Sequence, residues 1–409
     1  MQTTTYKQTP IGLIPSDWEV KKFDKATKLI TCGLAATPIY VDAEFGMPFF
    51  SAQNVQNCKV IFDNFKYIPL ELYRQITKNS KPEKGDILYT RVGAGIGEAG
   101  IIDIDFEFGI YVSLTLIKLN KEILNNYFLL NILNSDYYRK LAKRDQFAGG
   151  GVQNLNVQVV KEFNIPIPPL PEQQKIATIL STWDAAIDKC KEIIEKLKMR
   201  NKGLAQQLLS GNFKQKKLSE IFERVTTKNT EGNQNVITIS AQRGFVMQTD
   251  FFNKVIASDI LDNYFLVQKG DFCYNKSYSN GYDWGATKRL NDLDKAVVTT
   301  LYICFRLKDE SKNSGDFFEY YFESGILNEG LSKVANEGGR AHGLLNVTPT
   351  DFFNIKVGIP TLEEQIKIAK ILFTASSELN QYQQKLQILQ QQKKGLMQQL
   401  LTGKTRVKI

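Results

Sequence analysis

One ten-residue segment occurs twice in this chain of 409 residues, and it constrains the fold more than any other feature. The segment KGLAQQLLSG occupies residues 202–211 and KGLMQQLLTG occupies residues 394–403, so eight of the ten residues agree at an offset of 192. The similarity extends backwards at the same offset, because IPPLPEQQKIATIL at 167–180 corresponds to IPTLEEQIKIAKIL at 359–372. An internal repeat of this kind indicates two copies of one structural unit.

Apolar residues recur in alternating steps of three and four through both copies. They are Leu180, Trp183, Ile187, Cys190, Ile194, Leu197, Leu204 and Leu208 in the first copy, and Leu372, Ala375, Leu379, Tyr382, Leu386, Leu389, Leu396 and Leu400 in the second. Asn201 and Lys393 fill the single gap in each series. This spacing predicts two long helices of roughly 37 residues and roughly 55 Å that bury these seams against each other. A plain coiled-coil spacer or a dimerisation arm is the simpler interpretation of the same pattern.

The ends of both helices carry recognisable signals. Pro171 suits a first helical turn, and Thr361 with Glu364 has the spacing of a capping box. Gly211 and Gly403 stand where left-handed caps would end the helices.

The segments before each helix also correspond to each other. SAQN at 51–54 matches SAQR at 240–243, KGDILYTR at 84–91 matches KGDFCYNK at 269–276, and LNVQVVKEFNI at 155–165 matches LNVTPTDFFNI at 345–355. Strand-like runs separated by Gly, Asn and Pro alternate with helical runs, which indicates an α+β fold. We expect a first globule at 1–165, a helical spacer at 166–213, a second globule at 214–357 and a second spacer at 358–409.

Composition narrows the possible functions. The net charge of +9 favours a polyanionic partner, with nucleic acid first. A single histidine and the lack of a Cys/His cluster argue against a zinc site or a Ser-His-Asp triad. Five scattered cysteines suggest free thiols in a reducing cytoplasm. The sequence contains no run of about 18 apolar residues, so we expect no membrane span.

The sequence VGAGIGEAG contains the glycine spacing of a dinucleotide-binding motif at Gly95, Gly97 and Gly100. That motif requires a following helix whose N-terminus meets the pyrophosphate. The residues that follow are strand-like, so we expect a hairpin here, or glycines that let the backbone approach a DNA phosphate.

Taken together, the two helical repeats, the KGD segments and the LNV before each helix resemble the specificity (S) subunit of a type I restriction-modification system, over nearly the whole chain. The resemblance implies two target-recognition globules separated by two long helices that form an antiparallel coiled coil with pseudo-twofold symmetry. It implies that each globule reads half of a bipartite site in double-stranded DNA and that two methyltransferase subunits dock on the helices. It further implies a cytoplasmic, non-catalytic subunit for phage defence. S-adenosylmethionine, ATP and Mg²⁺ would act only on the methyltransferase and restriction (motor) subunits.

Base readout needs polar side chains on rigid supports: Arg or Lys suits guanine, and Asn or Gln suits adenine. In the first globule the candidate DNA-binding residues are Ser51, Gln53, Asn54, Tyr89, Thr90, Arg91, Arg144, Gln146, Gln153 and Asn154. In the second they are Ser240, Gln242, Arg243, Tyr274, Asn275, Lys276, Arg340, His342 and Asn346. Differences between matched positions, such as Arg91 against Lys276, predict two different half-sites. The alternative role for each of these residues is to cap a turn or to be a solvated group at the surface.

The matched helix ends suggest where a partner present in two copies would bind. Gln206, Gln207, Gln398 and Gln399 lie off the predicted seam and are the candidate contacts for the methyltransferase. An S-type protein that serves a stand-alone methylase is one alternative. A structural adaptor whose globules bind proteins is another, and salt dependence distinguishes it, because phosphate-dominated binding weakens steeply with salt.

Overall fold

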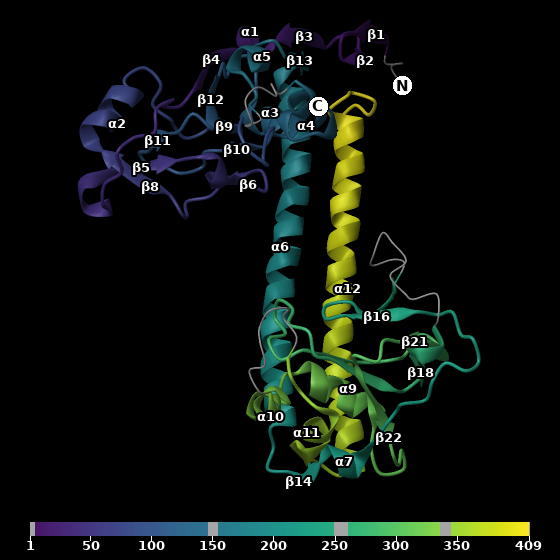
Figure 1. Ribbon diagram of the computed structural model, residues 1–409. Helices are drawn as coiled ribbons and strands as arrows, with labels where there is room; N and C mark the ends of the chain where they lie inside the picture. Colours follow the sequence, from purple (N-terminus) through teal and green to yellow (C-terminus); the bar gives the residue numbers. More distant parts are fainter. Residues whose placement is uncertain (1–4, 146–153, 249–260, 336–344, 409) are drawn as a thin grey trace. The chain divides into compact units, whose positions relative to one another are not determined.

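The computed structural model describes residues 5–145, 154–248, 261–335 and 345–408. The chain forms two compact units. Unit 1 comprises Met1–Lys191 with Lys385–Ile409, and unit 2 comprises Glu192–Gln384. Each unit therefore contains one globule and part of both long helices, whose course can be followed in Figure 1.

Unit 1 is built on a six-stranded sheet in the order β4-β12-β9-β10-β7-β6. These strands are β4 (Thr27–Cys32), β12 (Leu114–Leu119), β9 (Ile87–Thr90), β10 (Ala99–Ile101), β7 (Lys59–Val60) and β6 (Val55–Gln56). A second sheet contains β11 (Gly109–Ile110), β5 (Gly46–Phe50) and β8 (Lys66–Pro69), followed by α2 (Leu70–Thr77). The remaining elements are β1 (Tyr6–Thr9), β2 (Gly12–Pro15), β3 (Glu19–Lys22), α1 (Phe23–Ala26), α3 (Asn126–Leu133), α4 (Asp136–Arg144), α5 (Val157–Lys161) and β13 (Asn164–Ile167).

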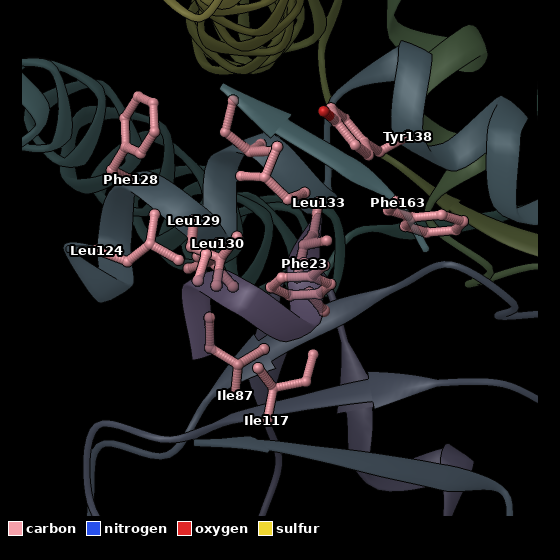
Figure 2. Close-up of a cluster of buried hydrophobic side chains, with 14 of the residues drawn as sticks. Phe23, Ile87, Ile117, Leu124, Phe128, Leu129, Leu130, Leu133, Tyr138 and Phe163 are labelled. Atoms are coloured by element: carbon pink, nitrogen blue, oxygen red, sulfur yellow. The ribbon is translucent and has the colours of Figure 1, made fainter. Parts of the chain in front are cut away.

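The core of unit 1 lies between this sheet and the short helices. Phe23 of α1, Ile87 of β9 and Ile117 of β12 are fully buried beside Leu129 and Leu133 of α3. Figure 2 shows these side chains converging from the sheet and from both helices. Successive side chains of β9 point to opposite faces of the sheet, and both faces are covered. The strand therefore contributes to two hydrophobic clusters.

Unit 2 repeats the central part of this plan. Its four-stranded sheet has the order β15-β22-β19-β20, formed by β15 (Phe222–Arg224), β22 (Ile303–Leu307), β19 (Phe272–Asn275) and β20 (Ala286–Arg289). The helices α9 (Gly315–Glu323), α10 (Asn328–Val334) and α11 (Pro349–Asn354) follow in the same order as α3, α4 and α5 of unit 1. Further strand pairs are β14 (Lys214–Lys217) with β23 (Lys356–Ile359), β16 (Ile237–Ser240) with β17 (Gly244–Met247), and β18 (Phe265–Gln268) with β21 (Lys295–Val298).

The repeated Lys-Gly-Asp segment is explained by a tight turn into the central strand. Gly85 and Gly270 both have φ +93°, a conformation that favours glycine. The next residue caps the turn: Asp86 accepts the Glu83 N–H at 2.9 Å, and Asp271 accepts the Gln268 N–H at 2.8 Å. Burial raises the pKa of both aspartates above the ordinary value.

The two long helices are α6 (Leu170–Leu209) and α12 (Leu362–Leu400). All predicted seam positions on both helices are buried or half-buried, which confirms the heptad pattern. In unit 1, Lys393 contacts Asp184 at 2.6 Å. In unit 2, Asn201 donates to the Ala375 carbonyl at 2.8 Å and Arg200 contacts Glu378. As the residue number of the contact on α6 rises, that of its partner on α12 falls, so the helices are antiparallel.

Three of the predicted end signals are present, and one is wrong. Pro171 lies in the first turn of α6, and Thr361 and Glu364 form the expected capping box. Gly403 has φ +68°, as expected for a left-handed cap. Gly211 has no positive φ; a Cβ at this position would lie 2.5 Å from the Phe213 ring, so a larger residue would require that ring to move.

Candidate nucleic-acid interface

The predicted DNA-binding residues on the central strand of unit 1 are buried. Tyr89 and Thr90 are 0% exposed. Arg91 is 7% exposed, and its guanidinium donates to the Leu155 carbonyl at 2.9 Å, the Val112 carbonyl at 3.2 Å and Asn154 Oδ1 at 2.8 Å. Burial lowers the pKa of Arg91. Arg91 thus links the end of the strand to neighbouring backbone, and burial keeps the hydroxyl groups of Tyr89 and Thr90 from solvent, which argues against base reading by all three residues.

Asn54 is also a structural residue. Its side chain is fully buried, accepts the Ser51 N–H at 3.0 Å, and donates to the Asp63 carbonyl at 2.8 Å. It therefore closes the short turn at Ala52–Asn54, and this burial argues against base reading, as it does for Arg91.

Four other predicted residues of unit 1 are at least partly accessible. Gln53 is exposed and donates to the Asn64 carbonyl, and Ser51 is half-buried. Arg144 at the end of α4 is exposed and forms an ion pair with Asp145 at 2.6 Å. Asn154 is half-buried, with its oxygen committed to Arg91. Gln146 and Gln153 lie outside the described residues.

Some of the predicted DNA-binding residues of unit 2 lie in the core, and others lie at the surface. Tyr274 is 1% exposed and donates to the Trp284 carbonyl at 2.8 Å, and Ser240 is 7% exposed, so neither presents its hydroxyl to a partner. Asn275 is half-buried and accepts the Ser277 N–H at 3.0 Å. Gln242, Arg243 and Asn346 are exposed, and Lys276 is half-buried. Arg340 and His342 lie outside the described residues.

In the loop between β19 and β20, sequence reasoning singled out only Lys276. Tyr278 in this loop is 61% exposed, and Asn280 is also exposed. The signal was available, because KSYSNGYDWG interleaves aromatic and polar residues between two strands, a composition typical of binding loops.

The four glutamines at the helix ends are all exposed. Gln206 and Gln207 lie between the half-buried Leu204 and Leu208, while Gln398 and Gln399 precede the buried Leu400. Their position off the seam agrees with the prediction, and their role as partner contacts stays a prediction.

Two chemical features of the described residues bear on possible functions. No helix within the described ranges is long and apolar enough to cross a membrane. Within the same ranges, no three His, Cys, Asp or Glu residues gather in a group suited to a metal ion. The absence of cofactors on this chain remains an expectation.

Comparison with known proteins assigns the chain to a family. The model of the type I restriction modification DNA specificity domain matches twice, at residues 15–199 and 211–390. The MjaX specificity subunit of Methanocaldococcus jannaschii is 27% identical, with 98% of this chain and 97% of that protein aligned. The EcoKI specificity subunit of Escherichia coli is 23% identical, with 88% and 82% aligned.

A solved structure of similar fold agrees with this assignment. The S subunit of the type I restriction-modification system from M. genitalium superposes with a TM-score of 0.55 at 17% identity, covering 98% of this chain and 99% of that one. The two matches of the family model coincide with the two repeats that the sequence contains. The chain belongs to the type I restriction modification DNA specificity domain family, as a specificity subunit of a type I restriction-modification system.

Proposed function

We propose that this specificity subunit reads a bipartite site in double-stranded DNA, with one half-site for each unit. One observation carries the proposal: the two units share a scaffold and differ in the groups they expose. The strand orders β4-β12-β9-β10 and β15-β22-β19-β20 are equivalent, as are the Asp86 and Asp271 turns. A duplicated scaffold with different surface chemistry is suited to two different base sequences.

The same chain positions two methyltransferase subunits through its long helices. The exposed glutamines at the matched ends of α6 and α12 offer nearly the same surface twice, which suits a partner present in two copies. The subunit itself performs no chemistry. Methyl transfer from S-adenosylmethionine to adenine belongs to the methyltransferases, and ATP- and Mg²⁺-dependent cleavage belongs to a restriction subunit where one joins. The complex acts in the cytoplasm, where its DNA lies.

The net charge of +9 supports DNA over a protein ligand. An adaptor whose globules bind proteins remains the second candidate, because the described part of unit 1 exposes apolar side chains such as Ile39, at 83%, and Phe45, at 69%. Such residues are typical of protein contacts when they cluster.

One experiment separates the two functions. The chain is purified with its methyltransferase, and the complex selects from DNA containing a randomised region at several salt concentrations. The proposal expects two short conserved sequences at a fixed separation, and affinity that falls steeply with salt. Binding without any base preference, or affinity indifferent to salt, would favour the adaptor.

A further inference from the structure

One loop of unit 2 has a chemistry that its counterpart in unit 1 lacks. Residues 276–285, between β19 and β20, read KSYSNGYDWG. Residues 91–98, between the equivalent β9 and β10, read RVGAGIGE, with Arg91 turned inwards and buried. The two scaffolds match, so the difference lies in the loops, where specificity concentrates on a shared framework.

A second loop is fixed against this one in unit 2. Gln242, at the tip of the β16–β17 hairpin, donates its Nε2 to the Asn280 carbonyl at 3.0 Å and lies 3.4 Å from Ser279 Oγ. The tip itself is ordered by Gly244, with φ +77°, and by the Arg243 N–H, which donates to Ser240 Oγ at 3.3 Å. Two loops that are distant in sequence therefore form one surface.

The groups displayed on this surface suit base edges. Tyr278 is 61% exposed, and Arg243 and Asn280 are exposed. Within the described ranges, the Arg243 guanidinium has no hydrogen-bond or ion-pair partner. An arginine pairs with guanine, an asparagine with adenine, and a ring contacts the thymine methyl group, while a two-stranded ribbon fits the major groove.

We propose that the paired loops 241–243 and 276–284 are the base-reading surface of unit 2. Arg243, Tyr278 and Asn280 face the bases of one half-site, and Gln242 is a positioning residue that holds the two loops together. This inference rests on the proposed function. Unit 1 reads its half-site with other residues, because its corresponding loop is rich in glycine and its Arg91 is committed to the protein.

Single substitutions in the full chain, complexed with its methyltransferase, test the proposal. Arg243→Ala, Tyr278→Ala and Asn280→Ala are compared on DNA with single-base changes in both half-sites. Each should reduce the preference at one or two base pairs of the same half-site by roughly 5- to 150-fold, and leave the other half-site unchanged. Lys312→Ala is the matched control, since it removes one positive charge from an exposed turn of unit 2 and should alter no base preference.

Gln242→Ala tests the positioning role. It should weaken the preferences assigned to Arg243 and to Tyr278 together, without changing the salt dependence of binding, because it removes no charge. Gln242→Glu keeps the side-chain shape but cannot donate to the Asn280 carbonyl, so it should weaken the same preferences. Its added negative charge should also lower the affinity for every sequence, which Gln242→Ala should not do. Thermal unfolding of each variant should match that of the wild type.

Two outcomes overturn the inference and leave the proposed function intact. In the first, the wild type reads two half-sites but all three loop variants keep its preferences. In the second, Arg243→Ala weakens every sequence equally and reduces the salt slope by about one, which identifies a phosphate contact. A wild-type complex with no base preference would instead refute the proposed function itself.

Discussion

At the scale of single residues, the most informative pair is Gln173 and Gln365, which occupy the same place in the two repeats. Both are buried, and each accepts the backbone N–H of the residue that caps an earlier short helix of the same unit: Asn125 of α3 at 2.9 Å and Ser314 of α9 at 2.8 Å. Each also donates to a proline carbonyl five residues before it. The recurrence of this glutamine in the sequence thus has a structural cause in both units.

Replacement of Gln173 by Leu should reduce the free energy of unfolding by at least about 2 kcal/mol, because several buried backbone groups lose their partners at about 1–3 kcal/mol each. Chemical denaturation measures the change. Gln174→Leu, at an exposed position on the same turn, is the control and should shift stability by less than about 0.5 kcal/mol. Equal effects of the two variants would contradict the assigned role.

A residue near the end of the chain stabilises the first globule. Arg406 donates to Asp17 at 2.7 Å and to the fully buried Glu172 at 2.7 Å, and Glu172 also accepts from Trp18 Nε1 at 2.9 Å. The hydrogen bond from Arg406 lowers the pKa of Asp17 below its ordinary value of 3.8. The Asp17 contribution is therefore complete above that value and is lost as the pH falls through the lower folded-state pKa.

The pH dependence of unfolding tests this interaction. Between about pH 5 and about pH 3, wild-type stability should fall more steeply than that of Asp17→Asn, which cannot ionise. Urea denaturation at several pH values gives both slopes. The difference is expected to be small, because the Asp17 side chain is half exposed to solvent. Identical slopes would mean that Arg406 does not perturb Asp17.

At the scale of elements, each of the two long helices has one polar residue in the seam, and each of these residues forms an ion pair or a hydrogen bond with the other helix. The Lys393 side chain is only 14% exposed, and Asp184 opposite remains 49% exposed. We expect Lys393→Leu to raise the free energy of unfolding by roughly 1 kcal/mol, because the seam gains apolar burial and Asp184 stays solvated. Gln390→Leu, at an exposed position on α12, is the control in the same denaturation experiment. A marked loss of stability in Lys393→Leu would show that the ion pair is needed.

At the end of α6, the residue expected to stabilise the fold differs from the residues expected to bind the methyltransferase. Leu209 is 2% exposed, while the predicted seam residue Leu208 is half-buried. We therefore expect Leu209→Ala to reduce the free energy of unfolding by about 2–5 kcal/mol, and Leu208→Ala to reduce it by less. Gln206→Glu with Gln207→Glu should change stability by less than about 0.5 kcal/mol and weaken methyltransferase binding. Denaturation and titration with the methyltransferase measure the two effects. Unchanged binding by the glutamine variant would remove these residues from the docking surface.

At the scale of the whole molecule, the proposed function assigns all chemistry to partner subunits. The purified chain with S-adenosylmethionine and DNA should transfer no methyl group, and addition of the methyltransferase should produce methylation at sites that contain both half-sites. Incorporation of labelled methyl groups into DNA measures this. Transfer by a preparation shown to be free of methyltransferase would refute the assignment of chemistry to the partner.

The sequence by itself determined the repeated plan and the helical seam. Helix periodicity depends on residues three and four apart, so a single chain displays it directly, and the repeat at an offset of 192 predicted that both units would have the same elements. The Lys-Gly-Asp turns and the Thr361–Glu364 cap were equally readable, because each is satisfied within a few residues.

Only the tertiary structure decided which polar residues are available to a partner. Arg91 and Arg243 look similar in sequence, but acceptors 21 to 64 residues away bury the first, whereas the second lies exposed at a hairpin tip. The pairing of Gln242 with the loop around Asn280, 38 residues away, was likewise invisible in the sequence. Exposure of a polar side chain depends on neighbours that the fold supplies from distant parts of the chain, and local pattern carries no information about them.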